Sequence, residues 1–318
     1  MDSIPYYFSH ARTAFKFGIQ HLGIKKGDCI LIPDYICDVI LHPLNQLGIE
    51  YKYYSLEDDL SFNCDQLENL LDTKTKALLF VHYFGQPQNI KSLQNFCKNH
   101  DLFLIEDNSH GYGGAYSGKD LGTFGDIGIS SPRKLLTSTY SGGVLWTKNK
   151  ELNTQIRIPE FPILKIERIK KKLTNSYPLL KNKVKKVLKK RPLYEDPRAF
   201  REPIISDYNI DIWSKKIIIK NNWDDMRNKR ILYYNEREKF ALKNGLKPVF
   251  SKLHFEANPW CFPAYANNKV EAVKWFKWGW ENNQRVFSWP SLPEEIINLK
   301  GSALDRYDRL LCFSLDDN

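Results

Sequence analysis

Short apolar segments alternate with segments of helical pattern along roughly the first 110 residues of the chain. The apolar segments are CILIP (29–33), YKYY (51–54), ALLFVH (77–82) and LFLIED (102–107). Between them, apolar residues recur three or four positions apart, as at Phe15, Ile19 and Leu22. This alternation predicts an α/β fold in which a mostly parallel central sheet is flanked by helices.

Two polar residues, His82 and Asp107, stand at the ends of predicted strands, and in parallel sheets ligands bind beyond the carboxyl ends of the strands. Glycine-rich loops follow from 114 to 147. Lys134 lies there between FGDIG and SGG, where the backbone can come close to a ligand. Taken alone, Asp107 could equally be a turn residue and Lys134 a solvated surface charge.

A buried lysine near a strand-end carboxylate is the pair of residues that pyridoxal phosphate requires. Only a neutral, desolvated amine attacks a carbonyl to form a Schiff base. The cofactor also needs a carboxylate on its pyridine nitrogen and backbone amides on its phosphate. Asp107 is the candidate for the carboxylate, and the helix beginning near Ala11, Arg12 and Thr13 is the candidate for the amides.

The net charge of +10 comes from one segment. Residues 164–191 hold 12 Lys and Arg against a single acid, Glu167, which leaves 35 basic and 36 acidic residues elsewhere. The segment is interpreted as a solvated helical face or as a weak contact with an anionic membrane. A nucleic-acid arm is disfavoured, because Tyr177 is the only aromatic residue in it.

Composition and spacing restrict the other classes. No run of eighteen apolar residues exists and the N-terminus lacks a signal-peptide pattern, so we expect a cytoplasmic protein. The six cysteines are scattered without a C-x-x-C pair, which agrees with a reducing compartment. Histidines and cysteines show no metal-ligand spacing, and we predict no metal site.

Four regions are expected along the chain. They are a major domain (1–157), a basic insertion or linker (158–205), connecting helices (206–245) and a small C-terminal α+β domain (246–318). The connecting region has one long helical pattern over 211–245. Trp275, Trp278 and Trp280 are expected in the domain core or a subunit interface, in preference to a sugar-stacking platform.

Four motifs in order resemble the DegT/DnrJ/StrS family of pyridoxal-phosphate-dependent sugar aminotransferases, which have the aspartate aminotransferase type of fold. They are FSHARTAFKFGIQHLGIKKGDCILIPDYIC, TKTKALLFVHYFGQPQNI, LIEDNSHGYGGAYSGKDLGTFGD, and the lysine of SSPRK followed by SGG. The match runs over roughly residues 8–150, with weaker similarity toward the C-terminus. The combination is specific, because four separate motifs occur in the same order.

The resemblance implies a role for each matched position around the cofactor ring. Lys134 would form the Schiff base with pyridoxal 5'-phosphate and later move a proton as the catalytic residue. Asp107 would pair with the pyridinium nitrogen, and His110 would lie beside the ring hydroxyl. Either Tyr35 or Cys37 would face the ring, where relatives carry a threonine nearby and this chain has Ile36.

The resemblance also implies a phosphate site and a dimer. Ser130 or Ser131 would contact the phosphate together with the amides at the start of the first helix. Relatives often use an asparagine from the neighbouring subunit as well, and Asn209 is the candidate here. The active unit would then be a homodimer.

The implied activity is amino transfer, with glutamate as the expected donor, to a keto group of a nucleotide-linked deoxysugar for surface polysaccharide or glycan synthesis. Two alternatives remain open. One is another pyridoxal-phosphate chemistry such as sugar dehydration, although relatives that dehydrate carry histidine in place of the lysine. The other is a catalytically degenerate member that acts as a binding or regulatory protein.

Overall fold

The computed structural model describes residues 3–148, 152, 157–163, 196–198 and 201–316. The basic segment 164–191 lies outside the described residues, and the predicted membrane contact lies there with it. No helix within the described residues is both long and apolar enough to cross a bilayer.

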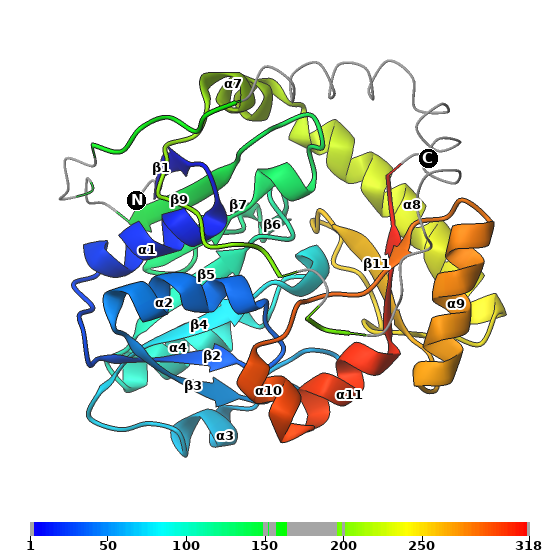
Figure 1. Cartoon of the computed structure of the whole chain (residues 1–318), viewed down its shortest axis with the longest axis horizontal. Coiled ribbons are helices and arrows are strands. Elements are labelled where there is room, and N and C mark those ends of the chain that lie inside the picture. The colour runs from blue at the N-terminus through cyan, green and yellow to red at the C-terminus, as the bar shows by residue number, and fades with distance from the viewer. Residues whose placement is uncertain (1–2, 149–151, 153–156, 164–195, 199–200, 317–318) are drawn as a thin grey trace.

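A seven-stranded sheet forms the centre of the N-terminal half (Figure 1). Its strands are β1 (Ser3–Phe8), β2 (Cys29–Pro33), β3 (Glu50–Tyr54), β4 (Thr75–Val81), β5 (Phe103–Asn108), β8 (Ile127–Ser130) and β9 (Gly143–Lys148). The spatial order is β1-β9-β8-β5-β4-β2-β3. The strands from β8 to β3 are parallel. β9 runs in the opposite direction, and β1 pairs with it antiparallel and so has the direction of the other strands. The predicted mostly parallel central sheet is confirmed.

Helices connect the parallel strands as the sequence periodicity predicted. They are α1 (Ala11–His21), α2 (Leu41–Leu47), α3 (Cys64–Glu68) and α4 (Ile90–Asn99), with 3-10 turns η1 (Asp38–Ile40), η2 (Tyr83–Gly85) and η3 (Pro132–Lys134). Buried Phe15 and Ile19 anchor α1, which packs against β8, β9 and α2. Pro43 lies in the first turn of α2, where a missing backbone N–H breaks no helical hydrogen bond. The segment DQLENLLD (65–72), whose pattern predicts a helix, is α-helical only as far as Glu68.

The long helical pattern over 211–245 forms two helices instead of one. These are α7 (Ile212–Lys220) and α8 (Trp223–Lys243). Asn221 has an extended backbone with ψ of 138°, and the side chain of Asn222 accepts a hydrogen bond from the Asp225 amide at 3.1 Å. An asparagine that caps a new helix competes with continuation of the old one, which explains the break.

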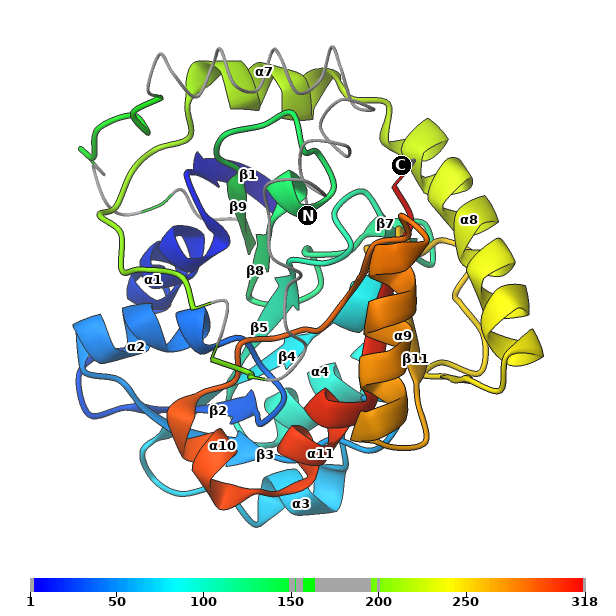
Figure 2. The same ribbon diagram turned by 45° about the vertical axis from the view of Figure 1, so that its right-hand side comes forward.

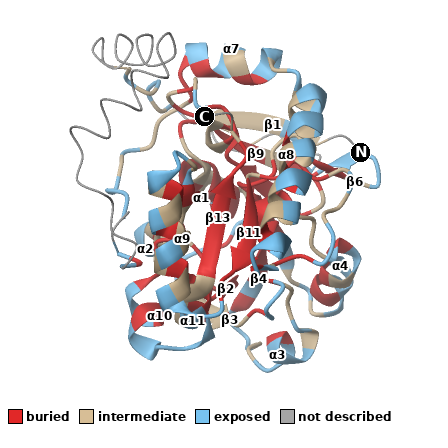
Figure 3. Cartoon of the chain, turned by 90° about the vertical axis from the view of Figure 1, so that its right-hand side faces the viewer, coloured by how far each residue is buried: buried red, intermediate tan, exposed pale blue. Residues whose placement is uncertain are grey.

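A second sheet lies in the C-terminal part. Its strands are β10 (Lys247–Pro248), β11 (Cys261–Tyr265), β13 (Leu310–Ser314) and β12 (Val286–Phe287), in that spatial order and all antiparallel. Figure 3 shows β11 and β13 buried between α8 and α9 (Lys269–Glu281), whose outer faces are exposed. A separate hairpin joins β6 (Ala115–Tyr116) to β7 (Lys119–Asp120).

The C-terminal part also contacts the edge of the first sheet. Helices α10 (Glu294–Leu299) and α11 (Ser302–Arg309) lie beside β3 in both views (Figures 1 and 2). The hydroxyls of Tyr51 and Tyr53 donate to Glu295 at 3.0 and 2.8 Å. Arg306 donates to the backbone oxygens of Leu56 and Glu57 at 2.8 and 3.1 Å. These hydrogen bonds link the C-terminal part of the chain to β3 and the residues that follow it, at the edge of the first sheet.

A buried histidine–carboxylate pair fixes the carboxyl ends of β4 and β5. Nε2 of His82 lies 2.8 Å from Oε1 of Glu106, and both side chains are fully buried. The amides of Gly122, Phe124 and Gly125 also donate to Glu106, at 2.6, 2.6 and 3.0 Å. Since Nδ1 of His82 already accepts from a backbone amide at 3.0 Å, the ring donates through Nε2. The carboxylate therefore ties the loop before β8 to the two strands.

Close packing of Gly143 brings the start of β9 against the start of α1. A Cβ at this position would lie 2.1 Å from the carbonyl carbon of His10 and 2.5 Å from the nitrogen of Ala11. Beside it, the amide of Gly142 donates to the Ser9 oxygen at 2.7 Å. The second glycine of the SGG motif is thus explained by backbone contact with the helix start, and the first has a positive φ of 156°.

We expect Gly143→Ala to lower the free energy of unfolding by about 3 kcal/mol, because the atoms it meets are backbone and cannot rotate away. Urea unfolding measures the loss. Gly301→Ala is the matched control: it has ordinary φ of −85° and open space around it, and should change stability by less than about 1 kcal/mol. Equal unfolding midpoints for the two variants would contradict the packing argument.

Glu106→Gln tests the buried pair and its pH dependence. Burial alone would raise the pKa of Glu106, but the bonds from His82 and the loop amides outweigh it and hold the pKa below its ordinary value of 4.5. A carboxyl with a lowered pKa stabilises the fold above its unfolded pKa, and this stability is lost as pH falls through the folded value. We expect the variant to be less stable than the wild type by about 3 kcal/mol at neutral pH.

The difference between the Glu106→Gln variant and the wild type should narrow when urea unfolding is repeated below about pH 4, where the wild-type carboxylate takes up a proton. Glu50→Gln is the control, because Glu50 is half exposed and pairs with Lys74 at the surface. Its loss should stay below about 1 kcal/mol. A difference for Glu106→Gln that is constant with pH would show that the side chain is not ionised in the fold.

Candidate active site

A cavity of about 500 Å³ lies beyond the carboxyl ends of β4, β5 and β8, next to the start of α1. Residues at or just after these strand ends line it, among them Val81, Asp107 and Ile129. Another wall comes from the C-terminal part, through Trp260, Arg285 and residues 287–291. The cavity therefore lies where parallel sheets bind ligands, and both parts of the chain enclose it.

Lys134 lines this cavity from the end of η3. Its Nζ lies 5.0 Å from the ring centre of Trp260 and 5.6 Å from that of Trp289. Burial lowers the pKa of Lys134, while Cys37 and Asp107 act in the opposite direction. A lowered pKa increases the fraction of neutral amine, which is the nucleophilic form.

Asp107 lines the same cavity from the end of β5. Its Oδ1 accepts a hydrogen bond from the amide of Ser109 at 2.8 Å. Burial raises the pKa of Asp107, and the contact with Ser109 and the charge of Lys134 oppose this effect. The structure thus brings Lys134 and Asp107 into electrostatic contact across one cavity.

His110 is buried at the cavity wall and held on two sides. Its ring stacks on Trp260 with centroids 4.7 Å apart, and its edge meets Trp289 at 4.4 Å. Nδ1 accepts from the amide of Phe84 at 3.2 Å, which leaves the proton on Nε2. Burial, followed by the charge of Lys134, lowers the pKa of His110 well below its ordinary value, so the ring is neutral.

The start of α1 opens onto the cavity through His10, Ala11 and Arg12. The side chain of the cap residue, His10, accepts no hydrogen bond from the amides in the first turn of α1. These amides are therefore not capped by that side chain. Thr13 is buried and lines a small adjoining pocket toward α2 instead of the cavity.

Ser131 lines the cavity, and Ser130 does not. The Oγ of Ser130 is buried and has no hydrogen-bond partner within the described part of the chain. It lies near Gly122, where a Cβ would approach it to 3.1 Å. Of the two serines left open by the sequence, Ser131 is therefore the one that a bound group in the cavity can reach.

Cys37 lines the cavity, whereas Tyr35 lies behind it. The Tyr35 hydroxyl donates to the backbone oxygen of Trp289, and its ring meets the Trp289 ring edge-on at 5.8 Å. Burial raises the pKa of the Cys37 thiol to about 11, which keeps the sulfur protonated. Cys37 thus faces the cavity, and Tyr35 supports the tryptophan wall.

Asn209 lies outside the cavity of its own chain. Its Nδ2 donates to the backbone oxygen of Ile158 at 2.9 Å, and its backbone forms bridges with Phe8 and Glu160. This places Asn209 beside β1.

Sequence reasoning missed several side chains of the cavity, namely Arg133, Glu202, Trp260, Arg285 and Trp289. Arg133 directly precedes Lys134. This position in the sequence is a signal that could have identified Arg133 as a residue of the site. The other four lie far along the chain from the recognised motifs, in stretches without a local signature, and only the fold brings them to the site.

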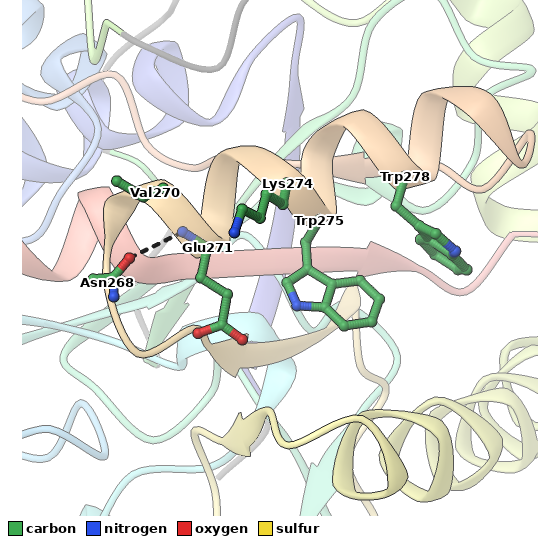
Figure 4. Close-up of a pocket in the computed structure, with 6 residues that line it drawn as sticks. All are labelled: Asn268, Val270, Glu271, Lys274, Trp275 and Trp278. Carbon is green, nitrogen blue, oxygen red and sulfur yellow. Dashed lines mark hydrogen bonds between the residues drawn. The ribbon is translucent and has the colours of Figure 1, made fainter.

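A second hollow, an open groove of about 810 Å³, runs along the outer face of α9 and contains Trp275 and Trp278 (Figure 4). Both rings pack on Phe240, with Trp278 stacked at 5.1 Å, so they belong to the edge of the second core. Two polar residues of the groove belong to the helix cap: Asn268 accepts from the Glu271 amide at 3.0 Å, as Figure 4 shows. The groove therefore offers few free polar groups for chemistry.

Solved structures with this fold cover almost the whole chain. Helicobacter pylori PseC, an aminotransferase involved in the biosynthesis of pseudoaminic acid, matches with a TM-score of 0.70 at 16% identity and covers 100% of this chain and 83% of its own. The putative sugar aminotransferase Spr1654 from Streptococcus pneumoniae, in its PLP form, matches with a TM-score of 0.70 at 13% identity and covers 98% and 82%. At such identities the likeness establishes the fold alone.

Curated relatives align with the N-terminal half. A GDP-perosamine synthase from Vibrio cholerae is 32% identical over 140 residues, which are 43% of this chain and 38% of that protein. A GDP-4-keto-6-deoxy-D-mannose 3-dehydratase from Escherichia coli O55:H7 is 30% identical over 131 residues, 41% of this chain and 34% of that protein. The match thus spans well under half the length of either relative.

A family model also matches, over residues 8–177, which is more than half of the 318 residues. Its family is the one that the four sequence motifs resemble, and the resemblance is confirmed. The chain belongs to the DegT/DnrJ/EryC1/StrS aminotransferase family.

Proposed function

We propose that this protein is a pyridoxal-phosphate-dependent aminotransferase acting on a nucleotide-linked keto-deoxysugar, with glutamate as the amino donor. One observation carries the proposal: Lys134 at the end of η3 and Asp107 at the end of β5 line one cavity and act on each other electrostatically. The names of relatives such as GDP-perosamine synthase support a nucleotide-sugar substrate. Such a product would serve polysaccharide or glycan synthesis in the cytoplasm.

The residues present fit pyridoxal phosphate. The cavity of about 500 Å³ is large enough for a small aromatic cofactor beside a substrate group. At its phosphate end, the buried Nε of Arg12 has no acceptor among the residues that the structure describes, and the His10 side chain does not cap the first-turn amides of α1. At its ring end, Asp107 offers a buried carboxylate. Arg12 and the amides of α1 could therefore donate to the phosphate, and Asp107 could accept from the protonated ring nitrogen.

When bound, the cofactor supplies an aldehyde that links to an amine and a ring that accepts electrons. Lys134 would hold the cofactor through its amine and would serve as the base that moves a proton at the donor's α-carbon. Asp107 would keep the ring nitrogen protonated by ionic contact. Neutral His110 can donate from Nε2, and Trp260 and Trp289 exclude water from the amine.

Ser131 and the amides of Ala11 and Arg12 would hold the phosphate, and Cys37 would lie against the ring. A homodimer with Asn209 reaching the partner's phosphate site remains part of the proposal, supported by the position of Asn209 beside β1, outside its own cavity. The alternatives are sugar dehydration and a binding role without turnover. The lysine at 134 favours amino transfer over dehydration.

Lys134→Ala should abolish the visible absorbance band that the wild type develops with pyridoxal phosphate, because Lys134 is the only lysine among the described residues that line the cavity. Spectra recorded during titration with the cofactor measure this. Lys119→Ala is the control, since Lys119 is exposed and lies over the Phe124 ring. A wild type without any band, or a band that survives in Lys134→Ala, would overturn the assignment.

Asp107→Asn should keep the absorbance band but lower turnover by about a hundredfold or more, because an amide cannot hold the ring nitrogen in its protonated form. Release of 2-oxoglutarate from glutamate in the presence of nucleotide-linked keto-sugars measures turnover. Asp101→Asn, at an exposed turn with φ of 51° that asparagine tolerates, is the control. Turnover equal to the wild type in Asp107→Asn would remove Asp107 from the site.

A further inference from the structure

Glu202 lies between two arginines at the mouth of the cavity. Its Oε2 is 2.8 Å from Nη1 of Arg12, and its Oε1 is 3.3 Å from Nη2 of Arg133. All three residues line the cavity, together with His10 and Ala11 at the start of α1. A single carboxylate thus bridges one guanidinium group from α1 and one from η3.

Both arginines have donors that this carboxylate leaves unused. Arg12 has only 8% of its side chain exposed, and its Nε is buried without a hydrogen-bond partner among the described residues. The Nε of Arg133 is buried and unpartnered in the same way. A buried donor without an acceptor is destabilising, so two of them beside an open cavity indicate that an acceptor belongs there.

The charge around the helix start is also unbalanced. Two guanidinium groups share one carboxylate, and the N-terminus of α1 adds partial positive charge. His10 does not contribute, because burial, followed by the nearby arginines, lowers its pKa to about 3 and keeps the ring neutral. The site therefore has an excess of positive charge that favours a further anion.

We propose that Arg12 and Arg133, bridged by Glu202, form a phosphate-binding pair at the start of α1. The proposal rests on the proposed function and extends it: the anion is the phosphate of the cofactor or the diphosphate of a nucleotide-linked substrate. A guanidinium presents adjacent N–H groups that match two phosphate oxygens. Glu202 neutralises part of the pair when no phosphate is bound, and its negative charge weakens the binding of phosphate.

The first experiment compares pyridoxal phosphate with pyridoxal, which lacks only the phosphate. Dissociation constants are measured from the visible absorbance of the link to Lys134. Dividing the dissociation constant of pyridoxal phosphate by that of pyridoxal removes effects that act through the Lys134 amine. Arg133→Gln should raise this ratio about tenfold, and Glu202→Gln should lower it severalfold. If the two substitutions change the affinity for pyridoxal phosphate relative to pyridoxal in opposite directions, the cause is charge. General damage to the site would weaken the binding of both ligands in both variants.

Lys16→Gln is the matched control. Lys16 lies on α1, pairs with Asp207 at 2.5 Å and does not line the cavity. The substitution Lys16→Gln removes one positive charge from α1, the helix that carries Arg12. It should leave the ratio of the dissociation constants of pyridoxal phosphate and pyridoxal unchanged. Thermal unfolding of each variant shows that it is folded. Arg133→Gln is preferred to Arg12→Gln because Arg133 is more exposed, at 32%.

The second experiment measures binding of GDP and UDP to the cofactor-loaded protein by calorimetry. If Arg133→Gln weakens the binding of GDP or UDP while the ratio of the dissociation constants of pyridoxal phosphate and pyridoxal stays unchanged, the arginine pair binds the substrate's diphosphate. If only the ratio of the two dissociation constants changes, the arginine pair binds the cofactor's phosphate. If neither this ratio nor the affinity for the nucleotides changes, the proposal is overturned. Failure of pyridoxal itself to link to Lys134 in the wild type would instead count against the proposed function.

Discussion

Two neighbouring carboxylates on β5 determine how the sheet ends and where the site begins. Because side chains alternate along a strand, Glu106 points into the fully packed interior and Asp107 into the cavity. Glu106 is satisfied by four donors, three of them backbone amides of one loop. Asp107 accepts mainly from Ser109 and keeps free capacity toward the cavity. One carboxylate is used for structure, and its neighbour is therefore available for chemistry.

The same loop then carries the chain into β8 and on to Lys134. If the loop lost its bonds to Glu106, β8 could not keep its register beside β5, where Asp107 pairs with Ile129. The position of the lysine relative to Asp107 depends on that register. A buried structural interaction on one face of the sheet thus sets the geometry of the cavity on the other.

The sequence was most informative where chemistry is local along the chain. Alternating apolar segments predicted the parallel strands, and short motifs predicted Lys134, Asp107 and His110 at one cavity. It could not distinguish Ser130 from Ser131, since that choice depends on which residue follows the last paired position of β8. Nor could it find Glu202 or Trp260, which reach the cavity across 68 and more residues from Lys134 only because of tertiary packing. The helix break at Asn221 was missed because apolar periodicity continues on both sides of it.

Trp260 shows how the C-terminal part supports the site. Arg230 of α8 donates to the backbone oxygens of Pro259 and Trp260 at 2.7 and 2.6 Å and pairs with Asp316 at 2.7 Å. These bonds fix the indole that stacks on His110 and shields Lys134. Charge links this wall to the helix start, because Arg133 lowers the pKa of Lys134 and Glu202 raises it. An anion bound by the arginine pair would act on the lysine in the same direction as Glu202, so the phosphate end of the cavity and its amine respond to each other through electrostatics.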